Sequence, residues 1–155
     1  MLAFLDMIAF AEGTSTSPAT KCKGYDVIVT GEDRKPEVFT DFSQHPFAGG
    51  RKSKVIREGL TSNAAGRYQF MGRYWLHYKA ALSLPDFGPA SQDKWAIQLI
   101  RECRAIDLVE SGNIVAAIVA CKSRWASLPG AGYNQKEHKA ADLLAAYTRA
   151  GGVLT

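Results

Sequence analysis

One carboxyl group in the N-terminal segment has the surroundings of a general acid. Glu12 follows Leu5 and Ile8 at helical spacing, so the three side chains share one face and Glu12 continues an apolar stripe. It also stands at the C-terminal end of the expected helix, where the helix dipole disfavours negative charge. Both effects favour the protonated carboxyl, which can donate a proton to a leaving oxygen. A structural Glu that pairs with an Arg or caps a neighbouring helix would occupy the same position, so position alone leaves both interpretations open.

The cysteines and histidines form no pattern that is typical of a metal site. Cys22, Cys103 and Cys121 are far apart, and their odd number argues against a complete set of disulfides. His45 and His138 lack a third ligand at a suitable spacing. We therefore expect reduced, mostly buried thiols, as in a reducing cytosol, and no metal or other cofactor.

Size and charge narrow the class of protein. The 155 residues, 46% apolar and 22% charged, suffice for a single domain over residues 1–155 with its own core. Residues 1–46 hold four Lys/Arg and seven Asp/Glu, a net charge of −3, whereas residues 47–155 hold fifteen and eight, a net charge of +7. A basic body favours an anionic polymer such as nucleic acid or cell wall. No run of Arg and Lys is interleaved with aromatic residues, so we expect no nucleic-acid partner.

The apolar N-terminus does not have the pattern of a membrane segment. Residues 1–11 lack a basic start, contain Asp6, and are too short to span a bilayer. No other segment approaches about 18 uninterrupted apolar residues. We expect neither an export signal nor stable insertion into a membrane.

The elements that position Glu12 are expected to be one helix, a small sheet and then several helices. The first helix covers residues 1–12 and ends at Gly13, a usual place for glycine. The β-rich runs at residues 25–31 and 37–42 predict a hairpin, and Val55-Ile56 predicts a short third strand. Helical patterns follow at residues 63–71, 73–82, 89–104, 105–110, 113–122 and 135–150. This order predicts an α+β domain with a mostly helical lobe, a small antiparallel sheet, and a cleft between them that suits an extended polymer.

Five blocks along the chain carry a family resemblance. They are residues 4–14, which end in Glu12-Gly13-Thr14, then 24–29 with 39–46, then Ala65-Gly66-Arg67-Tyr68-Gln69, then Ser91-Gln92-Asp93, then 125–133, which contain Leu128-Pro129-Gly130-Ala131-Gly132-Tyr133 and are followed by Gln135 and 137–139. In this order, across nearly the whole chain, they resemble the lambda-phage type of endolysin. A single Glu-Gly-Thr would be weak evidence, but five ordered blocks are strong. Asn134 and the loop at residues 51–59 depart from the family pattern.

The resemblance implies a lysozyme-like fold and the chemistry of a lytic transglycosylase. Glu12 would protonate the oxygen between N-acetylmuramic acid and N-acetylglucosamine, then remove a proton from the 6-hydroxyl of the muramic acid, which closes a 1,6-anhydro ring. The implied partner is the glycan strand of peptidoglycan, and we expect a monomer. The implied cellular role is host lysis, with synthesis in the host cytoplasm and action on the cell wall after release by a holin.

Five further residues are interpreted as substrate-binding. The Gln69 amide, in the expected helix at residues 63–71, suits an N-acetyl group or a hydroxyl. Tyr68 either stacks on a sugar or fills the core. Tyr133 follows a Gly-Ala-Gly turn and offers a ring and a hydroxyl, Gln135 is its neighbour, and Asp41 lies on the second strand of the hairpin.

Three alternative functions remain open from the residues alone. A hydrolytic muramidase would use Glu12 with a second carboxylate, and Asp26 and Asp41 are the candidates on the expected strands. Either could instead face solvent or stabilise a turn. A non-catalytic peptidoglycan-binding module would keep the aromatic residues without needing Glu12. A basic helical DNA-binding domain is favoured by charge alone.

Overall fold

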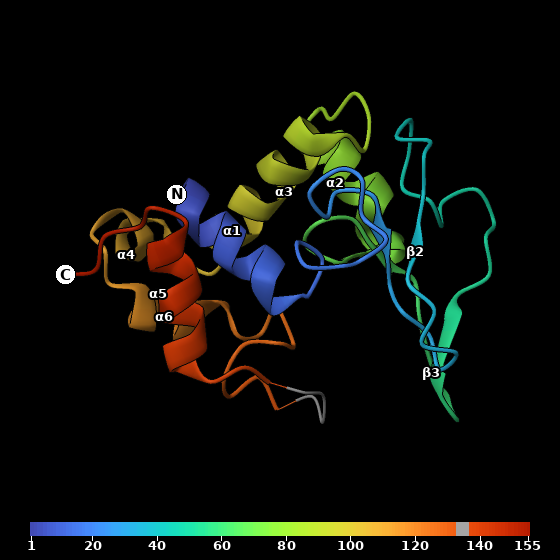
Figure 1. Ribbon diagram of the computed structural model, residues 1–155. Coiled ribbons are helices and arrows are strands. Elements are labelled where there is room, and N and C mark those ends of the chain that lie inside the picture. The colour runs from blue at the N-terminus through green and yellow to red at the C-terminus, as the bar shows by residue number, and fades with distance from the viewer. Residues whose placement is uncertain (133–136) are drawn as a thin grey trace. The chain divides into compact units, whose positions relative to one another are not determined.

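The computed structural model describes residues 1–132 and 137–155, and the chain divides into two compact units (Figure 1). Unit 1 comprises Met1–Glu12 and Ala96–Thr155, and unit 2 comprises Gly13–Trp95.

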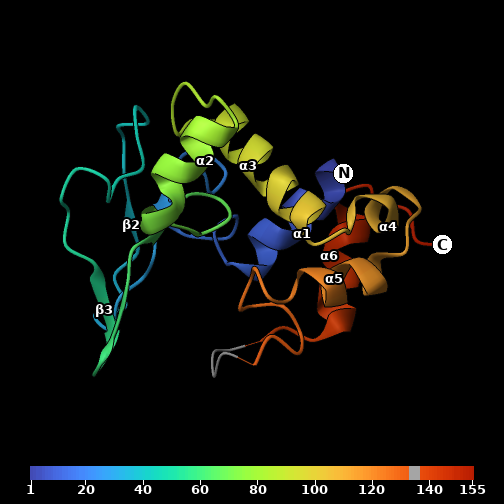
Figure 2. The ribbon, with the colours of Figure 1, turned by 180° about the vertical axis from the view of Figure 1, so that it is seen from behind.

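Unit 1 is built from helices around α1 (Leu2–Ala11). The others are the second half of α3 (Pro89–Glu102), α4 (Ile106–Glu110), α5 (Ile114–Cys121) and α6 (Ala140–Arg149). Helix α1 packs along α6, and both views show these two helices side by side (Figures 1 and 2). Because neighbouring segments cover α1 on most sides, it can be apolar almost all round.

The core of unit 1 consists mostly of aliphatic side chains, together with Phe4 of α1. Its fully buried members include Phe4, Leu5, Met7, Ile8, Ile100, Ile114, Leu128 and Leu143. Helix α1 ends where Gly13 adopts a φ of +70°, a conformation that glycine reaches without strain. This end places Glu12 at the C-terminal cap of the helix.

Unit 2 contains two small antiparallel sheets. The four-stranded sheet has the order β2-β1-β5-β6, built from β1 (Val27–Ile28), β2 (Glu37–Val38), β5 (Ala64–Ala65) and β6 (Phe70–Met71). A separate hairpin pairs β3 (Lys54–Arg57) with β4 (Leu60–Ser62). After β6, the 3-10 helix η1 (Gly72–Tyr74) leads into α2 (Trp75–Ala81), and unit 2 ends within α3.

Aromatic rings form the core of unit 2. The Phe70 ring stacks on Trp95 with their centroids 4.1 Å apart and their planes 3° from parallel. Phe87 and Trp75 pack edge to face, at 5.3 Å. Such pairs add to the free energy gained by burying the rings. This core holds β6 against α3.

The predicted α+β class and most predicted elements are confirmed. The hairpin at residues 25–31 and 37–42 exists, with Val27 opposite Val38, although its ladder is only two residues long. The third strand exists at Val55-Ile56, but it pairs with β4 in the separate hairpin. The last helix begins at Ala140 rather than at residue 135. None of the described helices is long and apolar enough to cross a membrane.

The predicted helix at residues 63–71 is wrong, because this segment forms the β5–β6 hairpin. Gly66 and Gln69 have φ angles of +82° and +51°, which a right-handed helix excludes. The turn is held from α3, where Gln92 Oε1 accepts a hydrogen bond from Arg67 N at 2.8 Å. A Cβ on Gly66 would lie 2.4 Å from that same oxygen, so only glycine fits.

Candidate active site

Glu12 occupies the last position of α1 in unit 1. Its backbone N–H donates to Ile8 O at 2.9 Å, which continues the helix for one more residue. The side chain is half-buried, and its Oε1 accepts a hydrogen bond from Ser127 Oγ at 2.5 Å. Burial raises the pKa of Glu12 to about 7, and the weaker effect of the Ser127 hydrogen bond opposes this rise. Glu12 can therefore hold a proton near neutral pH, as the sequence predicts.

His138 fixes the positions of Glu12 and Ser127 relative to each other. Its backbone N–H donates to Ser127 O at 3.0 Å, and its ring Nε2 lies 3.1 Å from Ala11 O. Because a carbonyl oxygen only accepts, Nε2 carries the hydrogen of this contact. The ring also packs against Phe10, with the ring centroids 5.3 Å apart. One histidine thus ties the end of α1 to the segment that carries Ser127.

The sequence does not predict that Ser127 binds Glu12 or that His138 joins the end of α1 to the Ser127 segment. Ser127 lies inside the matching block at residues 125–133, and His138 inside 137–139, but no spacing rule joins either residue to Glu12. The useful signal is the order of the blocks, because the resemblance already groups the segments of Ser127 and His138 with the block that carries Glu12. The metal-binding role considered for His138 has no support, because no group of three potential ligands occurs within residues 1–132 and 137–155.

A glycine turn near Ser127 is anchored by Glu137. Its two carboxylate oxygens accept hydrogen bonds from Gly130 N and Gly132 N, each at 2.8 Å. These contacts hold the pKa of Glu137 below its usual value. Tyr133 and Gln135, both interpreted as substrate-binding, lie outside the described residues. Glu137 and the two glycines that it binds lie on either side of Tyr133 and Gln135 in the sequence.

Gln69 lies in unit 2, at the turn between β5 and β6 rather than in a helix. Its Nε2 donates to Gly66 O at 3.0 Å, and a second contact to Val27 O measures 3.5 Å. The side chain is half-buried. The amide is thus oriented by the backbone of the turn, and its φ of +51° fixes the direction in which the side chain leaves the chain.

Tyr68 is packed inside unit 2. Its side chain is 1% exposed, and its hydroxyl donates to Asp93 Oδ1 at 2.5 Å. Tyr25 donates to the same oxygen at 2.8 Å. A ring without an exposed face cannot stack on a sugar, so the packing interpretation of Tyr68 fits the structure. The hydrogen bond from Tyr68 to Asp93 joins the β5–β6 turn to the first half of α3.

The two candidate partner carboxylates have different surroundings within unit 2. Asp26 is 4% exposed, accepting hydrogen bonds from Thr20 Oγ1 at 2.5 Å and Lys21 N at 2.9 Å. Both of its oxygens therefore serve to anchor the polar loop before β1. Asp41 is exposed, and its Oδ1 accepts from Ser43 N at 2.8 Å. Hydrogen bonds from Ser43 hold the pKa of Asp41 below its usual value, which keeps the side chain ionised.

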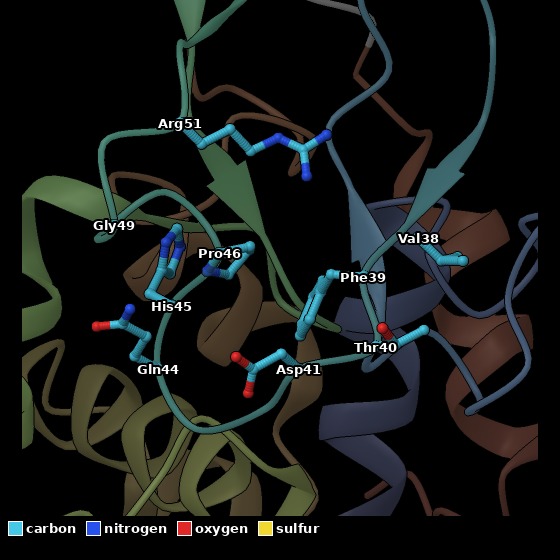
Figure 3. A pocket seen from close by; sticks show the side chains of 9 residues that line it. All are labelled: Val38, Phe39, Thr40, Asp41, Gln44, His45, Pro46, Gly49 and Arg51. Carbon is cyan, nitrogen blue, oxygen red and sulfur yellow. The ribbon is translucent and has the colours of Figure 1, made fainter.

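Asp41 lines an open hollow of about 340 Å³ in unit 2 (Figure 3). Phe39 and Asp41 come from the segment after β2, and the Arg51 side chain reaches over from the segment before β3. Arg51 also pairs with Glu37. The hollow thus combines a carboxylate, a guanidinium and an aromatic ring, which are groups that bind sugars or peptides.

His45, also among the residues that line this hollow, is a buried, neutral side chain. Its Nε2 is 2.8 Å from Phe70 O, and its Nδ1 accepts from Phe47 N at 3.2 Å. Burial lowers its pKa to about 4. These contacts give His45 a structural role that joins β6 to the segment after β2.

The helical unit 1, the small sheets of unit 2 and a glutamate with a raised pKa at the end of α1 define a lysozyme-like protein with a candidate general acid. Two solved structures are similar to the chain. Bacteriophage lambda lysozyme complexed with a chitohexasaccharide matches at a TM-score of 0.90 and 47% identity, covering 99% of this chain and 94% of that one. Lysozyme from bacteriophage lambda matches at a TM-score of 0.86 and 46% identity, covering 99% and 95%.

The sequence comparisons agree with the structural ones. The endolysin family model matches residues 2–154. The endolysin of Escherichia phage P2 is 57% identical over 152 residues, which are 97% of this chain and 92% of that protein. The endolysin of Escherichia phage lambda is 48% identical over 153 residues, 98% and 91% of the two chains. The chain therefore belongs to the endolysin family, and it is a peptidoglycan-cleaving enzyme.

Proposed function

We propose that the chain is a lytic transglycosylase that cleaves the β-1,4 bond between N-acetylmuramic acid and N-acetylglucosamine, with Glu12 as its acid and then its base. The observation that best supports this proposal is the raised pKa of Glu12, about 7, in a side chain that Ser127 orients by a hydrogen bond. The lambda lysozyme that resembles this chain was solved with a chitohexasaccharide, which supports a glycan substrate. We further propose that residues 1–155 act as one catalytic domain and as a monomer.

The hydrogen bond from Ser127 indicates which oxygen of Glu12 carries the proton. Oε1 accepts from Ser127 Oγ, so in the neutral carboxyl the acidic hydrogen resides on Oε2. In the proposed first step, Oε2 donates this proton to the glycosidic oxygen while the bond from that oxygen to C1 of the muramic acid breaks. Ser127 then stabilises the carboxylate that is left on Glu12, because its hydrogen bond strengthens when the acceptor becomes charged.

The second step returns Glu12 to its neutral form. The carboxylate removes the proton from the 6-hydroxyl of the same muramic acid, and O6 attacks C1 to close the 1,6-anhydro ring. One bond to C1 is lost and one is formed, one proton is donated and one recovered, and no water is consumed. Because the nucleophile belongs to the substrate, proximity takes the place of a second carboxylate.

The surroundings of the aspartates favour this mechanism over hydrolysis. A hydrolase needs a second carboxylate that can act as nucleophile or base. Asp26 is buried and its two oxygens bind Thr20 and Lys21, so it is not available. Asp41 is ionised and exposed in the hollow of unit 2, which suits a binding role. Gln69, Tyr133 and Gln135 are proposed to bind the glycan, with Tyr68 positioning the turn that carries Gln69.

The products distinguish the two mechanisms. Purified peptidoglycan is digested in water labelled with heavy oxygen, and the muropeptides are analysed by mass spectrometry. A lytic transglycosylase yields 1,6-anhydro-muramic ends without the label. Reducing muramic ends that carry the label would establish hydrolysis instead. Glu12→Gln serves as the control, because it should bind the cell wall and release neither product.

The proposed cellular role follows from this activity. The enzyme would be made in the cytoplasm of a host bacterium and reach the cell wall after a holin opens the membrane. Lysis of cells that carry the gene with and without a holin gene tests this route. Lysis at the same time in both would show that release is independent of the holin.

A further inference from the structure

The open hollow of unit 2 carries opposite charges at two separate places. Asp41 and Arg51 both line it, and Figure 3 shows their charged groups apart, with Phe39 and Pro46 between them in the view. Both charged side chains are exposed. The hollow therefore offers an anion and a cation to a single ligand that is long enough to reach both.

Neither charge is fully balanced by its neighbours. Asp41 accepts a hydrogen bond from Ser43 N at 2.8 Å, and within residues 1–132 and 137–155 it forms no ion pair. Arg51 and Lys54 both pair with Glu37, so two positive charges share one negative charge. One negative charge thus remains at the Asp41 end of the hollow and one positive charge at the Arg51 end.

A residue that lines the hollow is fixed against the β5–β6 hairpin. His45 Nδ1 accepts from Phe47 N at 3.2 Å, and its Nε2 lies 2.8 Å from Phe70 O. Phe70 directly follows Gln69, which is proposed to bind the glycan. The hollow is therefore attached to the same hairpin as a proposed glycan-binding residue.

The hollow suits a charged peptide better than a sugar ring. Phe39 is 7% exposed and packs against Phe42 and Phe87, with ring centroids 4.8 Å and 5.9 Å away, so little of its ring is open for a sugar to stack on. The sugars of the proposed substrate are uncharged once the lactyl carboxyl of muramic acid is joined to its peptide stem. The stem itself carries carboxylates and, on its diamino acid, an ammonium group. Complementary charges on the two sides of an interface favour binding.

We propose that this hollow binds the peptide stem of peptidoglycan, with the ammonium of the diamino acid at Asp41 and a carboxylate of the same stem at Arg51. The inference rests on the proposed function, because the stem belongs to the proposed glycan substrate. The planar guanidinium can donate two parallel hydrogen bonds to a carboxylate, and the ammonium can donate to Asp41. The volume of about 340 Å³ lies within the range of roughly 300–1,000 Å³ that is usual for ligand sites.

Binding of the free stem tests the proposal without any cleavage. The tetrapeptide L-alanyl-γ-D-glutamyl-meso-diaminopimelyl-D-alanine is titrated into the full chain labelled with heavy nitrogen, and backbone amide signals are followed by NMR. We expect saturable shifts at Thr40, Asp41 and Arg51. The same peptide acetylated on the side-chain amine of its diamino acid should bind about tenfold more weakly, as expected for one lost charge-assisted hydrogen bond. Equal affinity for the two peptides, or shifts only outside the hollow, would overturn the proposal.

Matched variants separate the hollow from general charge. Asp41→Asn and Arg51→Gln should each weaken tetrapeptide binding about tenfold. Asp33→Asn and Lys52→Gln make the same charge changes at exposed positions outside the hollow, and Asp33 accepts from Lys35 N at 3.2 Å as Asp41 accepts from Ser43 N. These two controls should bind within about twofold of the unmodified chain. Controls that weaken binding as much as the hollow variants would overturn the proposal.

Two further measurements keep the result interpretable. Thermal unfolding shows whether each variant is folded, and Arg51→Lys replaces Arg51→Gln if the latter is not, because lysine keeps the charge that Glu37 binds but lacks the planar fork. In Asp41→Asn, acetylation of the peptide should no longer change the affinity, and a full tenfold loss there would overturn the assignment of the ammonium to Asp41. Failure of the titration would leave the 1,6-anhydro products in place, and hydrolytic products would leave the titration in place, so the two proposals fail separately.

Discussion

Ser127 Oγ donates a hydrogen bond of 2.5 Å to Glu12 Oε1, although 115 positions separate the two residues along the chain. The bond leaves Oε2 as the oxygen that carries a proton, and it orients the carboxyl on the end of α1. Burial raises the pKa of Glu12, while this hydrogen bond lowers it. The balance of the two effects gives Glu12 a pKa of about 7, and each can be tested separately.

Replacing Glu12 by Gln should abolish cleavage while the fold persists. The amide cannot donate a proton to the leaving oxygen or remove one from the 6-hydroxyl, and each such transfer contributes about 10²–10⁴-fold to a rate. We expect kcat to fall by at least about 10³-fold. Release of soluble muropeptides from purified cell walls gives the rate, and sedimentation with cell walls shows whether binding is kept. Cleavage within tenfold of the unmodified chain would exclude Glu12 as the general acid.

Replacing Ser127 by Ala should move the pH dependence of cleavage upward. The hydrogen bond from Ser127 favours the charged form of Glu12, so its removal raises the pKa of Glu12 further above about 7. The acid form then persists to higher pH, and the basic limb of the kcat/KM profile shifts to higher pH. Ser127→Thr keeps the hydroxyl and should restore the profile. A basic limb that stays in place in Ser127→Ala would contradict the assigned contact.

The raised pKa of Glu12 also predicts how stability depends on pH. The pKa of Glu12 is about 7 in the folded protein and 4.5 for an unperturbed glutamate, so folding favours the neutral form. This contribution is complete below pH 4.5 and is lost as the pH rises through about 7. Glu12→Gln has no carboxyl to ionise at this position, so it does not lose this stability. The free energy of unfolding of Glu12→Gln minus that of the unmodified chain should therefore increase by about 1–3 kcal/mol between pH 4 and pH 8. Urea unfolding of both proteins at the two pH values measures this difference. A difference that decreases as the pH rises would contradict the raised pKa of Glu12.

Replacement by Asn should affect stability at Asp26 and substrate binding at Asp41. Asp26 accepts from Thr20 Oγ1 and Lys21 N while buried, and an Asn amide group can satisfy only one of these donors. Asp26→Asn should therefore lower the free energy of unfolding by about 1–3 kcal/mol. Asp41 is exposed, so Asp41→Asn should leave stability unchanged and raise KM a few-fold. Both variants should still yield 1,6-anhydro ends. Loss of cleavage in a folded Asp41→Asn protein would favour the hydrolytic mechanism.

The sequence predicts the elements of this protein better than it predicts the contacts of its site. The end of α1 is local, because Gly13 and the apolar spacing of Leu5 and Ile8 determine it, and Glu12 is placed correctly. The β5–β6 turn depends on Gln92, which lies 25 positions from the Arg67 backbone that it holds, and propensity alone therefore predicts a helix there. Ser127 contacts Glu12 only because the folding of unit 1 brings two distant segments together. No spacing along the sequence could therefore predict this contact.

Gln69 offers a test of a residue whose structural and binding roles can be separated. Its φ of +51° is strained for a side chain with a Cβ, by about 1 kcal/mol, and glycine relieves this strain. Gln69→Gly removes the hydrogen bond to Gly66 O, a loss of similar size, so stability should stay within about 1 kcal/mol. If the amide binds the glycan, KM should rise about tenfold, which corresponds to one lost hydrogen bond to substrate. Gln69→Asn tolerates the same backbone conformation but shortens the side chain, and it should give an intermediate KM. An unchanged KM in a folded Gln69→Gly protein would show that Gln69 stabilises the turn and does not bind the glycan.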